Sequence, residues 1–272
     1  MIYKKIYLKD YFPTIKSDAS LTSYCLSNHE EYPYDIKRKT ILVIPGGGYA
    51  FVSKREAEPI AIRFMAYNFN VFVLDYTIGD FRFPTPIDEA FSAIAYIRRH
   101  ANEYHVDAKY IGVCGFSAGG HLAASVSNYF KEEQYQKMLG VQKDELRIDF
   151  TILAYPVLTT DPIKGHLGTS ERITQNIDDL IAYFDIVNHI SIYFPPTYMW
   201  STKEDVDVPP ECSRIFKEKL DGLHIKNEYH LFHKGSHGGS TCDSLTNNPV
   251  EVSNFEEAKV WIEQASNFIN SL

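Results

Sequence analysis

The fold is decided by the stretch Gly115-Phe116-Ser117-Ala118-Gly119-Gly120-His121. A short apolar run, residues 109–114, precedes it, and a helix-forming run begins at Leu122. A serine between two glycines at a strand-to-helix junction fits the G-x-S-x-G nucleophile elbow, a tight turn that exposes a serine hydroxyl. The residues around such a turn must be small, because strand and helix approach each other closely there. On this stretch alone, a glycine-rich turn without chemistry in an ordinary α/β fold is the alternative.

Strand and helix patterns alternate on both sides of this turn. Five further runs have the composition of strands: 40–44, 71–76, 149–155, 196–202 and 228–232. Helical patterns separate most of them, which predicts one parallel or mixed sheet covered by helices on both faces. Residues 3–8 and 21–26 predict an additional pair of antiparallel strands at one edge of that sheet.

Some helix boundaries can be predicted from single residues. Asp88 has the side chain of an N-cap and predicts a helix over 89–103. Asn254 predicts the start of a C-terminal helix in the same way. Residues 54–68 also have a helical pattern, with Glu56 among the polar positions.

The length of 272 residues favours one α/β domain over residues 1–272. Residues 157–195 carry no strong strand signal and are longer than a simple crossover between strands. We therefore expect them to form an insertion that roofs the site.

Charge and composition limit the partners. The net charge of −8 argues against nucleic acid, because phosphate binding requires a basic surface. No apolar run approaches the length that crosses a bilayer, so no membrane partner is expected. The first residues lack the apolar segment of a secretory signal, and the four cysteines are scattered. Together these features predict a cytoplasmic protein with reduced thiols.

Three residues have the types and the order that nucleophilic catalysis requires. A serine hydroxyl attacks poorly unless a histidine takes its proton and a carboxylate orients that histidine. Ser117 follows the 109–114 strand, Asp205 follows the 196–202 strand and His237 follows the 228–232 strand. Ligands bind at the carboxyl ends of parallel strands, and the order Ser, Asp, His is that of the α/β-hydrolases. The residues alone leave Glu204 and Asp207 as alternative acids.

A triple glycine follows the 40–44 strand and predicts an oxyanion hole. The amides of Gly47 and Gly48, with that of Ala118, could donate to a substrate oxygen without obstruction by side chains. A phosphate or dinucleotide loop is disfavoured, since Gly46-Gly47-Gly48-Tyr49 does not fit G-x-G-x-x-G and the chain has no Gly-Lys-Ser/Thr triplet. No cofactor is predicted.

A metal site built from His230, His233 and His237 is conceivable but disfavoured. Its spacing mixes strand and loop positions, and no cluster of carboxylates or cysteines completes it. No metal is therefore predicted.

Three motifs together resemble the acetyl-esterase branch of the α/β-hydrolases, whose members are described as acetylxylan or feruloyl esterase-like and are related to the hormone-sensitive-lipase group. They are Pro45-Gly46-Gly47-Gly48-Tyr49, Arg55-Glu56-Ala57-Glu58-Pro59-Ile60-Ala61, and the elbow. The resemblance implies an eight-stranded, mostly parallel sheet and hydrolysis of short acyl esters, commonly acetyl groups on sugars. It also implies that Asp205, which two residues separate from the dipeptide Val208-Pro209, is the acid, and that His237 within Gly235-Ser236-His237-Gly238 is the base.

The chain departs from the hormone-sensitive-lipase pattern at Pro45, where that group has histidine, and residues 166–170 of the roof resemble the family only loosely. Tyr49 and Tyr76 are candidate walls of a substrate pocket, with core aromatics as an equal alternative. The expected function is a serine hydrolase of short-chain carboxylic esters, such as an acetylated sugar. A serine peptidase or amidase, or a binding protein without catalysis, is the alternative.

Overall fold

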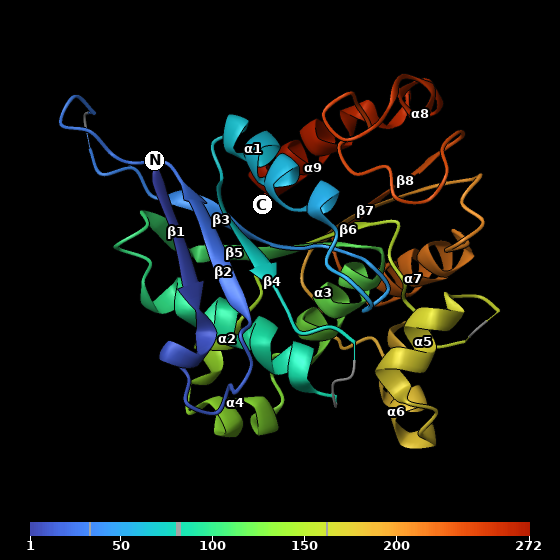
Figure 1. Ribbon diagram of the computed structural model, residues 1–272, viewed down its shortest axis with the longest axis horizontal. Helices are drawn as coiled ribbons and strands as arrows, with labels where there is room; N and C mark the ends of the chain where they lie inside the picture. The colour runs from blue at the N-terminus through green and yellow to red at the C-terminus, as the bar shows by residue number, and fades with distance from the viewer. Residues whose placement is uncertain (33, 80–82, 162) are drawn as a thin grey trace.

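The computed structural model of the chain describes residues 1–32, 34–79, 83–161 and 163–272, so Pro162 of the predicted roof lies outside the described residues. A single eight-stranded sheet organises the molecule, in the order β1-β2-β4-β3-β5-β6-β7-β8 (Figure 1). Its strands are β1 Ile2–Tyr7, β2 Ser20–Cys25, β3 Arg38–Ile44, β4 Asn70–Asp75, β5 Val106–Phe116, β6 Thr151–Ala154, β7 Thr197–Thr202 and β8 Asn227–Phe232.

Six of the strands run parallel. The pairs β4–β3, β3–β5, β5–β6, β6–β7 and β7–β8 are all parallel, whereas β1–β2 and β2–β4 are antiparallel. The predicted antiparallel pair at one edge and the eight-stranded, mostly parallel sheet are confirmed. Because β3, β5, β7 and β8 point the same way, the loops that follow them meet at one edge of the sheet.

Helices cover both faces of this sheet (Figure 1). The α-helices are α1 Glu58–Ala66, α2 Thr85–Arg99, α3 Ser117–Tyr129, α4 Glu133–Leu139, α5 Leu167–Thr174, α6 Asp178–Tyr183, α7 Glu211–Gly222, α8 Pro249–Asn254 and α9 Trp261–Asn270. Short 3-10 helices are η1 Leu8–Asp10, η2 Lys54–Glu56, η3 Lys143–Leu146, η4 Ile186–Asn188 and η5 Ala258–Val260. Buried side chains of α1 and α9 share one apolar core, and those of α2, α3, α4 and α7 share the other.

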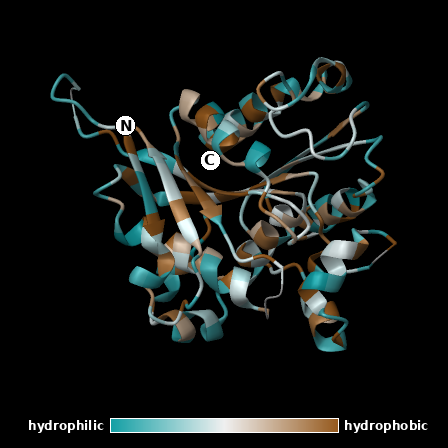
Figure 2. Ribbon diagram, in the orientation of Figure 1, coloured by the Kyte–Doolittle hydropathy of each residue, from teal (hydrophilic) through white to brown (hydrophobic). Residues whose placement is uncertain are grey.

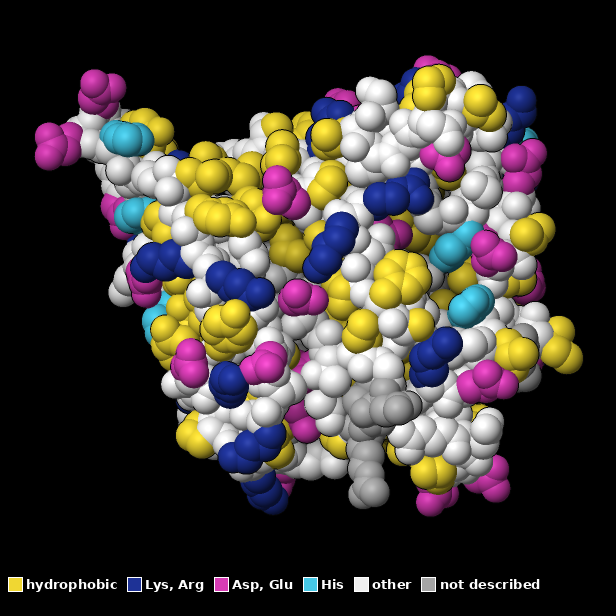
Figure 3. Space-filling view, in the orientation of Figure 1, with side chains coloured by type: hydrophobic (Ala, Val, Ile, Leu, Met, Phe, Trp, Pro, Cys, Tyr) yellow, Lys and Arg dark blue, Asp and Glu magenta, His cyan; other side chains and the backbone are white. Residues whose placement is uncertain are grey.

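The central strands are apolar on both faces because both faces are covered. Ile41, Leu42, Val43 and Ile44 are all fully buried, and Figure 2 shows hydrophobic stretches along the strands at the centre of the sheet. On the face seen in Figure 3, Lys and Arg side chains are interspersed with Asp and Glu. None of the helices in the described parts of the chain combines the length and the apolar character needed to cross a membrane.

The predicted helix starts at Asp88 and Asn254 are wrong. The helix α2 begins at Thr85, with Pro84 as N-cap and Pro86 in its first turn, so Asp88 lies inside the helix. Proline is favoured in a first turn because its fixed φ suits the helix and its missing N–H would have had no intrahelical partner. Asn254 ends α8, a helix capped by Asn248, and the C-terminal helix α9 begins later, at Trp261.

The predicted helix over 54–68 is divided in two. The 3-10 helix η2 precedes α1, and Ala57 between them has φ −105° and ψ −106°, outside the helical region. The break turns Glu56 inward, where only 5% of its surface is exposed. The polar side chain that the pattern places on the solvent face is therefore buried.

Candidate active site

The elbow is a strained turn between β5 and α3. Ser117, the first residue of α3, has φ +51°, a left-handed conformation that is rare for a residue with a side chain. A Cβ on Gly115 would lie 2.3 Å from the Gly119 carbonyl oxygen, and one on Gly119 would lie 2.2 Å from that of Ile44. Both positions therefore require glycine, as the sequence pattern predicts from the close approach of strand and helix.

A continuous chain of hydrogen bonds connects three loops at the carboxyl edge of the sheet. The Oγ of Ser117 lies 2.7 Å from Nε2 of His237, and Nδ1 of His237 lies 2.7 Å from Oδ2 of Asp205. Since a carboxylate only accepts, Nδ1 carries the proton and donates to Asp205. The Nε2 atom is then free to accept the Ser117 hydroxyl proton, which is the geometry of a general base beside a nucleophile.

The carboxylate of Asp205 is held in place by the backbone that follows it. Its side chain is fully buried, and Oδ1 accepts hydrogen bonds from the N–H groups of Asp207 at 3.1 Å and Val208 at 2.8 Å. Glu204 and Asp207 are exposed, and the Glu204 carboxylate accepts from the amide of Gly235. The structure thus brings Asp205, and not its two neighbours, to His237.

The loop of residues 45–48, here called the glycine loop, follows β3 and lies beside Ser117. Gly47 and Gly48 have φ +123° and +61°, and a Cβ on Gly47 would lie 2.0 Å from the carbonyl oxygen of Phe51. Among the described residues, none accepts a hydrogen bond from the amide of Gly47 or Gly48. Ala118 is in the first turn of α3, where N–H groups have no intrahelical acceptor. These three amides are available as donors.

An open pocket of about 620 Å³ lies over Ser117 and His237. Its size is in the range of sites for small ligands. The glycine loop, the exposed ring of Phe51 and the side chains of His166 and Arg172 contribute to its lining.

Two of these residues come from the 157–195 segment. Arg172, on α5, donates from Nη1 to the carbonyl oxygens of Gly48 at 3.3 Å and Gly168 at 2.7 Å. Burial, and then the nearby His237, lower the pKa of His166, which favours its neutral form. The segment predicted as a roof therefore contributes to the pocket lining and contacts the glycine loop through Arg172.

Tyr49 and Tyr76 lie in the core and do not belong to the described lining of this pocket. The hydroxyl of Tyr49 is 3.1 Å from Nδ1 of His121, and that of Tyr76 donates to the carbonyl oxygen of Pro45 at 2.8 Å. The prediction that they are pocket walls does not hold, because both side chains are buried in the core. His121 is also fully buried, and burial lowers its pKa to about 4.

The three histidines considered for a metal site have separate partners. His230 contacts Glu228, His233 contacts Lys203 and His237 is bound by Asp205 and Ser117. In the part of the chain that the structure describes, no group of three or more His, Cys, Asp or Glu side chains is arranged to hold a metal ion.

The sequence-based predictions do not name Glu56 as a pocket residue, and they include His166 and Arg172 only as part of the 157–195 roof. Glu56 lies between Arg55 and Glu58, both exposed, so no periodicity marks it as buried. Arg172 reaches the site only because α5 folds over the glycine loop. Neither the burial of Glu56 nor the contact of Arg172 with the glycine loop can be predicted from a local pattern in a single sequence.

Comparison with known proteins identifies the family to which the chain belongs. Residues 29–220 match the family BD-FAE. A relative described as an endo-1,4-beta-xylanase B, from Butyrivibrio fibrisolvens, is 33% identical over 75% of this chain and 33% of its own length. An acetylxylan esterase from Xylanibacter ruminicola is 26% identical over 76% of this chain and 42% of its own length.

The chain spans a third to two fifths of the length of these two curated relatives. A carboxylesterase from Lactobacillus plantarum matches more completely, with a TM-score of 0.88, 25% identity and coverage of 100% of this chain and 98% of its own. The resemblance inferred from the three motifs is confirmed. The chain belongs to the BD-FAE family, in the acetyl-esterase branch of the α/β-hydrolases.

Proposed function

We propose that this chain is a serine hydrolase of carboxylic esters that acts through an acyl-enzyme on short acyl groups, acetyl foremost. The observation that carries the proposal is the hydrogen-bonded chain Ser117–His237–Asp205 at the floor of an open pocket. A hydroxyl, a base with its accepting nitrogen toward it, and a buried carboxylate behind that base are the components of a nucleophilic hydrolase.

In this mechanism the Oγ of Ser117 attacks the ester carbonyl while Nε2 of His237 takes the hydroxyl proton. The buried Asp205 stabilises the imidazolium that forms, and the amides of Gly47, Gly48 and Ala118 donate to the oxyanion. The imidazolium then gives its proton to the leaving alcohol. Water, deprotonated by His237, attacks the acyl-enzyme and releases the acid, so the hydrolysis needs no cofactor or metal.

An acetylated sugar is the small-molecule ester that we favour as substrate. The pocket is open, and polar groups and the exposed ring of Phe51, 59% of whose surface is accessible, share its lining. Sugars combine apolar ring faces with hydroxyl groups, so this mixture suits them. The acetylxylan esterase of Xylanibacter ruminicola, as its name states, acts on an acetylated xylan. We further propose that residues 157–195 are the roof over the alcohol half of the ester.

The proposal is tested by hydrolysis of p-nitrophenyl acetate and labelling with a fluorophosphonate, in the wild type and in Ser117→Ala. We expect the wild type to turn over the ester and to be labelled. In the variant the rate of turnover should fall by at least about 10³-fold and labelling should disappear. A folded wild-type protein without turnover would favour a binding protein. Faster cleavage of an aminoacyl anilide than of the ester would favour a peptidase or amidase. Release of acetate from a panel of acetylated sugars then tests the alcohol half.

A further inference from the structure

A buried carboxylate that the mechanism above does not use lies beside the glycine loop. Oε2 of Glu56 accepts a hydrogen bond from the amide of Gly46 at 2.8 Å, and its Oε1 accepts one from the hydroxyl of Tyr155 at 2.7 Å. Taking a carboxylate out of water is expensive unless hydrogen bonds replace its hydration. Both oxygens already accept protein donors, so Glu56 is suited to hold structure in place and not to transfer a proton.

Glu56 and the residue that precedes its helix η2 fix the orientation of Gly46 by binding both its N–H group and its carbonyl oxygen. While the carboxylate binds the N–H of Gly46, the N–H of Ser53 donates to the Gly46 carbonyl oxygen at 3.0 Å. That carbonyl belongs to the same planar peptide unit as the N–H of Gly47. The direction of the Gly47 N–H, one of the proposed oxyanion donors, is therefore set by contacts from η2.

Gly46 lies between this carboxylate and the nucleophile. A Cβ on Gly46 would be 2.9 Å from Oε2 of Glu56 and 3.0 Å from Cβ of Ser117. No side chain separates the two, so a shift of the carboxylate is passed through Gly46 to the space beside Ser117. Oxyanion donors depend on such precision, because they must point at the position where negative charge develops on the substrate oxygen in the transition state.

The same carboxylate is connected to the loop that carries His237. The hydroxyl of Tyr155 donates to Glu56 and accepts from the amide of Ser240 at 3.0 Å, and the Tyr155 ring lies edge-on to the His237 imidazole at 5.0 Å. Burial, and then the charge of Glu56, raise the pKa of Tyr155 well above its ordinary value, so its hydroxyl keeps the proton that it donates. One path of hydrogen bonds thus joins Gly46, Glu56, Tyr155 and Ser240.

We propose that Glu56 is a positioning residue, which holds the glycine loop beside Ser117 and, through Tyr155, fixes the position of that loop relative to the loop of His237. The inference rests on the proposed function, since it assigns Glu56 to the oxyanion hole of that reaction. A contact that aligns oxyanion donors matters in the transition state and little in the ground-state complex. Its loss therefore lowers kcat and leaves KM nearly unchanged.

The test compares Glu56→Gln and Tyr155→Phe with the wild type in hydrolysis of p-nitrophenyl acetate. The glutamine keeps the shape of the side chain but presents an NH₂ group, itself a donor, to either the Gly46 amide or the Tyr155 hydroxyl, which both donate to the carboxylate in the wild type. We expect kcat to fall by about 10- to 100-fold in Glu56→Gln and by a few-fold in Tyr155→Phe, with KM within about twofold, since loss of one oxyanion donor costs about 10²–10³-fold. A boronic acid, which forms a tetrahedral adduct with the serine, should bind more weakly in proportion to kcat.

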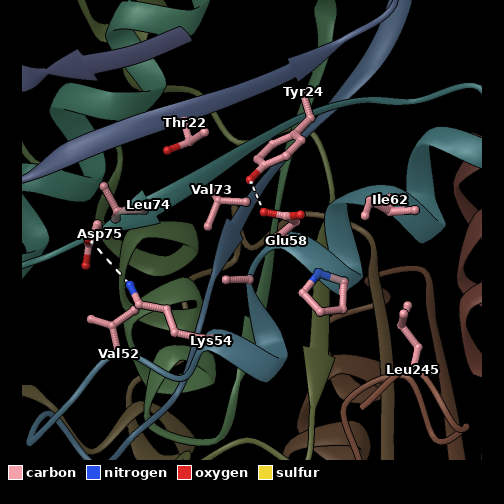
Figure 4. A pocket seen from close by; sticks show the side chains of 12 residues that line it. Thr22, Tyr24, Val52, Lys54, Glu58, Ile62, Val73, Leu74, Asp75 and Leu245 are labelled. Atoms are coloured by element: carbon pink, nitrogen blue, oxygen red, sulfur yellow. Dashed lines mark hydrogen bonds and ion pairs between the residues drawn. The ribbon is translucent and has the colours of Figure 1, made fainter. Parts of the chain in front are cut away.

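Glu58→Gln is the matched control. Glu58 lies two residues further along the chain but is exposed and faces a different pocket of about 440 Å³, where it accepts a hydrogen bond from Tyr24 at 3.3 Å (Figure 4). The substitution is chemically identical, and that pocket contains none of the three residues of the hydrogen-bonded chain. Its kcat should equal that of the wild type. Thermal unfolding of each variant shows that the protein is folded under the assay conditions.

The outcomes separate the two proposals. A wild type that is inactive, or a Ser117→Ala variant that retains activity, overturns the proposed function itself. Activity that depends on Ser117, combined with the same kcat in Glu56→Gln and Glu58→Gln, overturns the role of Glu56 alone. A raised KM with unchanged kcat would do so as well. If Glu56→Gln does not fold, a folded Tyr155→Phe with unchanged kcat is decisive against the inference.

Discussion

At the scale of single residues, burial and not position in the sequence distinguishes the proposed acid, Asp205, from its neighbours. Asp205 and Asp207 occupy one short loop, but the carboxylate of Asp205 is buried against His237 and that of Asp207 is exposed. A buried carboxylate can hold the tautomer of an imidazole because water does not compete for its oxygens. An exposed carboxylate in the same loop cannot.

We therefore expect Asp205→Asn and Asp207→Asn to differ greatly in rate. Asparagine at 205 can donate to Nδ1 and stabilise the wrong tautomer, so kcat should fall by roughly 10³–10⁴-fold, whereas Asp207→Asn should change kcat by less than about threefold. The measurement is p-nitrophenyl acetate hydrolysis, with circular dichroism to show that both variants fold. Equal losses in the two variants would contradict the assignment of Asp205.

At the scale of elements, the helix α2 contains a carboxyl group, that of Asp88, inside its length and not at its N-cap. Because the helix begins at Thr85 and not after Asp88, the Asp88 side chain lies within the helix, partly buried. Its Oδ1 has no hydrogen-bond partner in the described structure. Burial, and then the neighbouring Glu89, raise the pKa of Asp88 to about 7.

This raised pKa makes the stability of the protein depend on pH in a predictable direction. The folded state binds the Asp88 proton more tightly than the unfolded state, so this contribution to stability is present below pH 4 and is lost as the pH rises through 7. Asp88→Asn removes that loss. We expect the variant to match the wild type near pH 4 and to be more stable at pH 8 by roughly 2 kcal/mol, less than the full shift implies because the group is partly exposed. Urea unfolding at the two pH values measures the difference, and a variant that is less stable at pH 8 would contradict it.

At the scale of the whole molecule, the two cores on either side of the sheet enclose every cysteine. Cys25, Cys114, Cys212 and Cys242 are unpaired and at most 2% exposed. Burial raises the pKa of all four thiols, so they stay protonated and are poor nucleophiles.

Thiol reactivity should therefore report on global unfolding. With an aromatic disulfide reagent at pH 8, the native protein should react with far less than one equivalent in the time in which the unfolded protein reacts with four. The rate in the native state should rise with denaturant in step with the unfolded fraction. Rapid labelling of one thiol in a protein with native circular dichroism would show that one core opens locally.

The sequence by itself determined the sheet, the elbow and the order of the loops, because these follow from local patterns. Apolar runs specify buried strands wherever both faces of a sheet are covered, and the glycine at 115 is required by its close contact with Gly119 inside the elbow. The motifs around Gly46–Gly48 and Ser117 also sufficed to indicate the family to which the chain belongs.

Only the tertiary structure decided which polar groups are buried and which meet. Tyr49 and Tyr76 are core residues, Asp88 is inside a helix, and Glu56 faces inward because the chain breaks at Ala57. Gly46 and Glu56 are ten residues apart, Tyr155 and Ser240 lie much further along the chain, and hydrogen bonds join the four where η2 meets the loops after β3, β6 and β8. The burial of a polar side chain and its long-range contacts depend on how elements pack, and one sequence carries no local pattern for either.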